Sequence, residues 1–231
     1  MRDDICTIPV SEVFEHNDGC PICRMRDTIE ERMTDYILGD AMMEPDVRIE
    51  TNKTGFCEHH YNNMMSRRGR LQLALMLQTH INEINGEIFK KKLFNTDSKK
   101  TGNAKNITDS CFICSKIEWG LSRMIDTVYR CYETQKDFRD MFNSQSMFCL
   151  PHYERLLGGA SKRNMKSYYS DFTENLNRIT GEYSKSLYDD LSKYCTMYDY
   201  RSRDGETDWG NSRDAVERTV AFLNGRIYDV Y

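Results

Sequence analysis

The segments GCPIC at residues 19–23 and SCFIC at residues 110–114 each hold a Cys-x2-Cys pair, in a chain of 231 residues. Each pair is followed by a Cys-x2-His pair, in FCEHHY at residues 56–61 and in FCLPHY at residues 148–153. The second set follows the first at an offset of 91 residues, which becomes 92 residues after a single insertion. The sequence therefore contains an internal duplication built around cysteine and histidine.

The duplication extends beyond these pairs. Each set opens with an aspartate two residues before its first cysteine, Asp18 and Asp109. Each also contains the pattern Asp-x-Arg-x3-Asn, and its residues are Asp46, Arg48 and Asn52 in the first set and Asp137, Arg139 and Asn143 in the second. The inserted residue lies between Asn143 and Cys149, because the pattern is in register on either side.

A Cys-x2-Cys pair combined with a Cys-x2-His pair is typical of a tetrahedral Cys3His zinc site. Each pair can present two ligands from one turn, and two pairs that meet close the coordination sphere. The predicted ligands are Cys20, Cys23, Cys57, His60, Cys111, Cys114, Cys149 and His152, which gives two zinc ions per chain. His60 is preferred over His59, because it alone matches the register of His152.

Other chemistry remains open for these residues. Three thiolates and a histidine can hold an iron–sulfur cluster, although ligation by cysteine alone is commoner. A dithiol redox role is a further alternative, weakened because nothing alternates strand and helix as in a thioredoxin-like fold. The cysteines outside the duplicated pattern, Cys6, Cys131 and Cys195, are interpreted as ordinary thiols.

Helical periodicity follows each motif. Apolar residues recur at helical spacing after Cys23, up to Gly39, and again after Cys114. A long amphipathic helix is expected after each Cys-x2-His pair, the second over residues 164–197. The stripe expected to be buried is Leu73, Leu77, Ile81, Ile84 and Ile88 in the first helix, and Phe172, Leu176, Ile179, Tyr183, Leu187, Leu191 and Tyr194 in the second.

The predicted fold is mainly α, a duplicated helical metal-binding unit. Its parts are an N-terminal repeat at 1–94, a polar linker at 95–107, a C-terminal repeat at 108–198, and a loop and helix at 199–231. In that last helix Val216, Val220 and Leu223 are expected to face inward. The stripes of the long helices have no partner within their own repeat. They are therefore expected to pack together into one body, within one chain or across a homodimer.

The polar residues of the duplicated pattern admit two interpretations. Arg48 and Arg139 could each bind a carboxylate or phosphate through two hydrogen bonds. Alternatively, each arginine could support the metal-binding loop of its own repeat, which would explain why the pattern occurs in both. His80 has no counterpart in the second set and is a candidate base, extra ligand or hydrogen-bonded core histidine. Trp119 and Trp209 lie in similar local patterns and could stack a planar ligand or pack over a helix start.

Composition narrows the classes of function. The net charge is −4, which disfavours nucleic acid as a partner, and no stretch approaches the apolar length of a membrane-spanning helix. The start, MRDDICTIPV, lacks the layout of a signal peptide, so a cytoplasmic location is expected.

The segments IPVSEVFE, GCPIC, DVRIETNKTGFCEHHY, LALMLQTH, MFCLPHY and WGNSR-x-AVERTV-x-FL-x-G together resemble domain-of-unknown-function family 6062. The resemblance runs from about Thr7 to Gly225. It implies a full-length family member and a cytoplasmic bacterial protein, and it supplies no activity. The family's setting in anaerobic bacteria keeps iron–sulfur as the second choice of metal.

Two hypotheses for function follow. The first is a non-enzymatic, zinc-stabilised helical protein that binds a protein or small-molecule partner. The second is an enzyme, either an iron–sulfur redox protein or a catalyst with a cleft between the two repeats. The candidate groups of that cleft are Arg48, Arg139, His80, Asp46 and Asp137.

Overall fold

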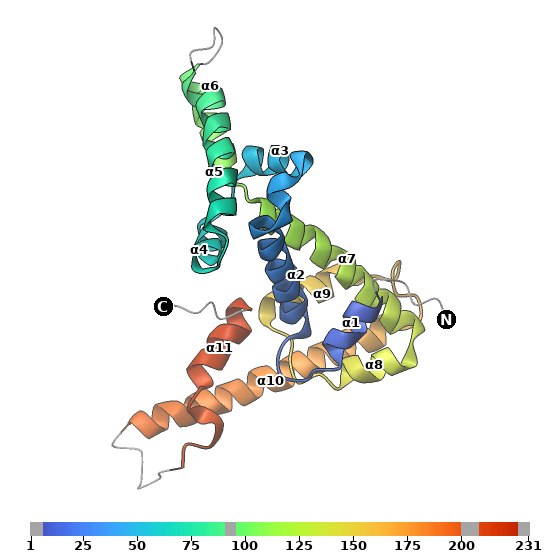
Figure 1. The fold of residues 1–231 in the computed structure, drawn as a ribbon. Helices are drawn as coiled ribbons and strands as arrows, with labels where there is room; N and C mark the ends of the chain where they lie inside the picture. The colour runs from blue at the N-terminus through green and yellow to red at the C-terminus, as the bar shows by residue number, and fades with distance from the viewer. Residues whose placement is uncertain (1–6, 91–95, 200–207, 226–231) are drawn as a thin grey trace. The chain divides into compact units, whose positions relative to one another are not determined.

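The computed structural model describes residues 7–90, 96–199 and 208–225, and within them the chain forms helices and connecting segments with no β-strand (Figure 1). The predicted mainly α fold is confirmed. In the described ranges, no helix combines the length and the apolar character that crossing a bilayer requires.

The chain divides into two compact units. Unit 1 contains residues 1–25 and 122–231, and unit 2 contains residues 26–121. Helices α2 (Pro21–Leu38) and α7 (Phe112–Thr134) each begin in one unit and continue into the other. The predicted segments 1–94 and 108–198 follow the order of the motifs along the chain. The compact units are divided differently: unit 2 is one continuous segment, and unit 1 combines two segments that are distant in the sequence.

Unit 2 consists of short and long helices that surround one hydrophobic core. Its further elements are η1 (Asp40–Met43), α3 (Pro45–Thr54), α4 (Glu58–Ser66), α5 (Arg70–Ile84), the π-helical turn η2 (Asn85–Phe89) and α6 (Asp97–Thr108). The core contains Ile37, Phe56, Met64 and Phe112, which come from α2, the segment before α4, α4 itself and α7. Two of these four residues are neighbours of predicted ligands in the sequence.

The predicted stripe is buried at Leu73 and Ile88, and Leu77 packs on the core, but the inward face differs from the prediction at Ile81. Leu73, Met76 and His80 are buried, whereas Ile81 is 52% exposed. Helix α5 packs on α3 and η1 within its own unit. The face at positions i, i+3 and i+7 therefore turns inward, and it includes a methionine and a histidine that a count of aliphatic residues passes over.

Unit 1 is built around aromatic side chains. Its further elements are α1 (Thr7–Phe14), α8 (Lys136–Asn143), α9 (Leu150–Gly159), α10 (Tyr169–Tyr198), η3 (Gly210–Ser212) and α11 (Ala215–Asn224). The ring centroid of Phe142 lies 5.7 Å from the ring centroid of Phe14, 4.9 Å from that of Phe148 and 5.0 Å from that of Phe172. The core thus joins α1, α8, α10 and the segment that leads into α9.

Helix α10 matches its predicted stripe, since Phe172, Leu176, Ile179 and Leu187 are buried. It packs on α8, α9 and α11 within unit 1. The expectation that the long helices α5 and α10 lack partners within their own halves is therefore wrong. Each long helix buries its apolar face against shorter helices of its own unit.

The orientation predicted for α11 is also wrong. Val216, Val220 and Leu223 are 41%, 42% and 49% exposed, and Ala215 and Phe222 are buried instead. Phe222 packs near Tyr183 of α10, with ring centroids 5.8 Å apart. One large ring outweighs three smaller aliphatic side chains in choosing the buried face.

The predicted polar linker at 95–107 forms a helix over its described part. Thr96 caps α6, because its hydroxyl accepts a hydrogen bond from the Lys99 amide at 3.3 Å. None of the residues of α6 is buried. Besides this N-cap, the helix is supported by packing on η2 and α3, with Ile107 half-buried. Cys6 and the segment 200–207 lie outside the described residues.

Candidate metal centres

The eight predicted ligands gather into two clusters, and the pairing crosses the repeats. Site A consists of Cys20, Cys23, Cys149 and His152, and site B consists of Cys57, His60, Cys111 and Cys114. Within each cluster the ligand atoms all lie within 4.8 Å of one another. The first Cys-x2-Cys pair thus meets the second Cys-x2-His pair, and the reverse, which corrects the sets defined by order along the chain.

Site A has the dimensions of a tetrahedron of donors. The Sγ atoms of Cys23 and Cys149 are 3.6 Å apart. The Nδ1 atom of His152 lies 3.6 Å from Cys20 Sγ, 3.3 Å from Cys23 Sγ and 3.1 Å from Cys149 Sγ. A zinc ion with Zn–S bonds of about 2.3 Å separates two sulfur ligands by about 3.8 Å, so these donors could hold one ion.

Site B has nearly the same geometry. The Sγ atoms of Cys57 and Cys114 are 3.8 Å apart. The Nδ1 atom of His60 lies 3.1 Å from Cys57 Sγ, 3.3 Å from Cys111 Sγ and 3.5 Å from Cys114 Sγ. Both histidines therefore present Nδ1 to the sulfur atoms.

Helix starts position the ligands. Cys57 and Cys149 are the N-cap residues of α4 and α9, and the histidines follow one turn later at buried positions. Pro151 occupies the first turn of α9, where its missing N–H group costs nothing. The other cysteine pairs lie at the starts of α2 and α7.

Hydrogen bonds join the loops that carry the two halves of each site. At site A the Asn17 side chain donates to the Ser144 carbonyl at 2.9 Å and accepts from the Ser146 amide at 2.6 Å. At site B the Ser110 hydroxyl donates to the Thr54 carbonyl at 2.7 Å, and the Phe112 amide donates to the Gly55 carbonyl at 3.0 Å. Segments far apart in the sequence are held together beside each cluster by these bonds.

Proton affinities differ among the thiols of one cluster. At site B, the hydrogen bond from Cys114 lowers the pKa of Cys111 to about 3, although burial opposes the change. The same interaction raises the pKa of Cys114. Burial lowers the pKa of His60, but its contacts with Cys111 and Glu30 outweigh this effect and raise the pKa to about 10.

Site A shows a related pattern. Burial raises the pKa of Cys20, but hydrogen bonds from Cys149, Cys23 and His152 lower it well below the usual value. The neighbouring thiols raise the pKa of Cys23, and the contact with Cys20 raises that of Cys149 to about 12. Each cluster thus favours one thiolate without metal, and a dication would supply the charge that stabilises the others.

The matching family model, Family of unknown function (DUF6062), covers residues 1–230. The chain belongs to this family. No curated protein and no solved structure matches the chain. The family membership confirms the resemblance seen in the sequence motifs, and the chemistry of this member has to be argued from its own residues.

The duplicated arginines brace the backbone in both units. Arg48 donates to the carbonyls of Met42 and Leu75, each at 3.1 Å. Arg139 donates to the carbonyl of Tyr132 at 2.9 Å, and its guanidinium lies 3.8 Å from the ring centroid of Tyr168. These contacts favour a structural role for the two arginines, in which they support the backbone, over the binding of a carboxylate or phosphate ligand.

The asparagines and aspartates of the pattern also have local roles. Asn52 accepts from the Thr79 hydroxyl at 2.9 Å, and Asn143 accepts from the Tyr132 hydroxyl at 3.0 Å. Asp46 and Asp137 are exposed in the first turns of α3 and α8. A negative charge at that position stabilises the positive end of a helix dipole.

His80 is a hydrogen-bonded core histidine. Its Nδ1 atom lies 2.8 Å from the Asn52 carbonyl oxygen, and the residue is 7% exposed. A Cβ atom on Gly55 would come within 2.8 Å of His80 Nε2, and Gly55 has a φ of +59°. Glycine is therefore required directly before Phe56 and the ligand Cys57.

Sequence reasoning missed a carboxylate beside site B. Glu30 of α2 is 2% exposed, and its Oε1 atom lies 2.7 Å from His59 Nε2 and 3.4 Å from His60 Nε2. Glu30 lies three residues before Met33 and seven before Ile37, so the helical period places it on the apolar side of α2. A carboxylate on that side, together with the second histidine His59 beside a predicted ligand, was the signal available in the sequence.

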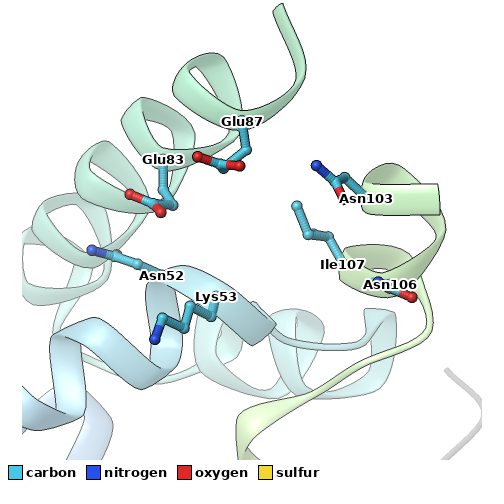
Figure 2. A pocket seen from close by; sticks show the side chains of 7 residues that line it. All are labelled: Asn52, Lys53, Glu83, Glu87, Asn103, Asn106 and Ile107. Atoms are coloured by element: carbon cyan, nitrogen blue, oxygen red, sulfur yellow. The ribbon is translucent and has the colours of Figure 1, made fainter. Parts of the chain in front are cut away.

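Two hollows lie near these features. Figure 2 shows a pocket of about 180 Å³ in unit 2, where Glu83 and Glu87 face Ile107 and Asn103 of α6 across the opening. Its lining also includes Asn52, Lys53 and Asn106, and no predicted metal ligand.

A second pocket, of about 300 Å³, borders site A in unit 1. Its lining includes Cys20, Cys23, Tyr183 and Arg218. The Arg218 guanidinium already pairs with Asp190 and Asp214, each at 2.9 Å. Its charge is thus compensated within the protein rather than available to an anion.

Proposed function

We propose that this family member is a non-catalytic helical protein with two structural Cys3His zinc sites, which together hold its two compact units in shape. The observation that carries this proposal is the complete set of four protein donors at both clusters, at the separations of a single tetrahedral ion. A metal with four protein ligands keeps no open position for substrate or water, which is typical of structural zinc.

The donor geometry favours zinc over an iron–sulfur cluster. All four donor atoms of each site lie within 4.8 Å of one another, which fits four ligands of one ion. An iron–sulfur cluster instead distributes its four ligands over two or more iron atoms, which separates at least some of the donors more widely. Thiolates with one imidazole also suit the borderline-soft character of zinc.

Zinc would contribute folding free energy because each site joins distant segments. Cys23 and Cys149 are 126 residues apart, and Cys57 and Cys114 are 57 residues apart. A bound ion closes these long loops, and the unfolded chain has no preformed site that could compete for it.

The proposal also places the protein in the bacterial cytoplasm, with a protein or small molecule as its partner. The exposed apolar residues Val216, Val220 and Leu223 on one face of α11 support a binding role, because such side chains are costly to leave in water. The arginine and histidine candidates for catalysis support it as well, since they hydrogen-bond to backbone carbonyls.

The test is metal content per chain, measured by inductively coupled plasma mass spectrometry on protein purified anaerobically without added metal. About two zinc ions per chain are expected, one for each Cys3His cluster. Iron with matching sulfide, together with a visible absorption band, would replace this proposal by an iron–sulfur redox protein.

A further inference from the structure

A buried carboxylate lies behind the histidine of site B. Glu30 extends from α2 towards two consecutive histidines of α4, and its side chain is 2% exposed. Its Oε1 atom lies 2.7 Å from His59 Nε2 and 3.4 Å from His60 Nε2. These three side chains form a group of their own beside the four donors of site B.

His60 is divided between the two groups. Its Nδ1 atom faces the three sulfur atoms at 3.1–3.5 Å, so Nε2 points to the opposite side of the ring. That Nε2 atom is buried and makes no hydrogen bond in the described part of the chain. The acceptor that faces it, at slightly more than hydrogen-bond distance, is Glu30.

A buried carboxylate needs a reason to be there. Removing a charged carboxylate from water is unfavourable unless partners with good geometry compensate for the lost hydration. His59 has a side chain that is 38% exposed, so its pairing with Glu30 could form equally well nearer the surface. The position of Glu30 is better explained by the ring that it faces on its buried side.

We propose that Glu30 is a positioning residue of site B. It accepts the Nε2–H of His60, which leaves Nδ1 without a proton and directed at the metal, and His59 holds the carboxylate in place. A metal-bound histidine commonly donates its other N–H to a carboxylate, which fixes the ring and increases its basicity. This inference rests on the proposed function, because it requires a metal at site B.

Site A provides an internal control. At the offset of the duplication, Glu30 corresponds to Leu121 and His59 corresponds to Pro151. Neither residue can accept a hydrogen bond through its side chain from His152. A change at Glu30 should therefore affect His60 and leave His152 unchanged.

The experiment compares Glu30→Gln with Glu31→Gln in the full chain. Glu31 is exposed on the same helix, so its substitution makes the same change in charge away from the site. Histidine-labelled protein is loaded with zinc, and EDTA is titrated while the imidazole NMR signals of His60 and His152 report the two sites separately. Glu30→Gln should weaken zinc binding at site B about 10- to 100-fold, with site A unchanged.

The same spectra test positioning directly. In the zinc-loaded natural chain, His60 should carry its proton on Nε2 and exchange it slowly with solvent. The Glu30→Gln substitution should shift this proton signal and speed its exchange, and His59→Gln should change it less. Loss of the signal in His59→Gln but not in Glu30→Gln would overturn the proposal.

The outcomes separate this inference from the proposed function. If the natural chain holds no metal at site B, the proposed function fails. If the natural chain binds zinc there, but Glu30→Gln and Glu31→Gln bind it equally, only the role of Glu30 fails. Should Glu30→Gln not fold, the natural chain decides, because a His60 ring with its proton on Nδ1 would contradict the proposal.

Discussion

Sites A and B have the same ligands at nearly the same separations, but they differ in their surroundings. At site A the cysteines and histidine are buried or half-buried, and the backbone of Gly225 lies beside two of the sulfur atoms. At site B the side chain of Cys114 is exposed, and a buried carboxylate lies behind His60. The ligand set decides which metal binds, and the surroundings decide how firmly and how reversibly it is held.

The largest effect should come from removing ligands in pairs. Cys20→Ser with Cys149→Ser alters one cluster and should cost one zinc ion per chain, whereas Cys20→Ser with Cys57→Ser should cost two. A structural zinc ion contributes on the order of 10 kcal/mol in isolated zinc-binding peptides, so unit 1 should lose cooperative unfolding in the first variant. Metal analysis and thermal unfolding measure these effects.

The comparison of these two double variants tests which Cys-x2-Cys pair shares a metal ion with which Cys-x2-His pair. If the metal sites followed the order of the motifs, Cys20 and Cys57 would share one ion. The second variant would then lose a single zinc ion, and the crossed arrangement would be wrong.

The next effect is the dependence of zinc affinity on pH. At site B the pKa of His60 is raised to about 10 and that of Cys114 is raised, so both groups hold protons at pH 7 in the metal-free protein. Zinc must displace these protons, and affinity should fall at least about 100-fold for each pH unit lost below neutrality. The fall continues towards the pKa of Cys111, about 3, where a further proton competes.

Site A should show a similar slope for a different reason, because its raised pKa values belong to Cys23 and Cys149. Calorimetry of zinc binding in buffers with different ionisation enthalpies counts the released protons. Release of fewer than about two protons per site would contradict the proton affinities described above.

The third effect is a loss of stability at a glycine that site B has and site A lacks. Gly55→Ala should destabilise unit 2 by about 1–3 kcal/mol, because the new methyl group meets His80 and the φ of +59° disfavours alanine. Denaturant unfolding of the zinc-loaded protein measures the change. Gly102→Ala is the matched control, since a Cβ atom there meets nothing within 4 Å.

Zinc binding at site A should be unaffected by Gly55→Ala, because Gly55 belongs to unit 2 and the ligands of site A belong to unit 1. The position of site A that corresponds to Gly55 holds Met147, so site A has no matching need for glycine. Unchanged stability of the Gly55→Ala variant would show that the chain before Cys57 adapts easily, and the strict need for glycine would be refuted.

The smallest effect concerns the reactivity of the thiols. Cys114 is the exposed ligand of site B, and the sulfur ligands of site A are buried or half-buried. Alkylation by N-ethylmaleimide should therefore reach Cys114 first and release the zinc of site B, roughly tenfold faster than that of site A. A Cys195→Ser background removes the other exposed thiol among the described residues, and mass spectrometry of peptides identifies the modified cysteine.

Modification of Cys149 or Cys20 before Cys114 would reverse the expected order. It would indicate that the pocket beside site A admits reagents more readily than the exposed face of site B.

Local patterns in the sequence predicted much of the helical architecture. The spacing of apolar residues predicted α10 and its buried stripe, and Gly39 marked the end of α2, which stops at Leu38. The motif Cys-x2-His placed ligands at the starts of α4 and α9, because a helix N-terminus presents residues i and i+3 on one side. These features depend on residues within a few turns of one another.

Other features depended on contacts between distant segments, and the sequence misled or was silent. The buried face of α11 was reversed by the packing of Phe222 against Tyr183, and a polar stretch expected to be a linker became α6. The arginines of the duplicated pattern proved to brace turns, since the carbonyls that they contact come from segments that only the fold brings near.

The sequence by itself determined the identity of eight candidate ligands and their grouping into i, i+3 pairs, because that grouping is a property of one helical turn. Only the tertiary structure decided which pairs meet, because every pairing of a Cys-x2-Cys with a Cys-x2-His satisfies the same local chemistry. The choice between them follows from the packing of each unit, which brings Cys23 to Cys149 and Cys57 to Cys114. Glu30 became visible for the same reason, since its relation to His60 exists only once α2 and α4 are packed.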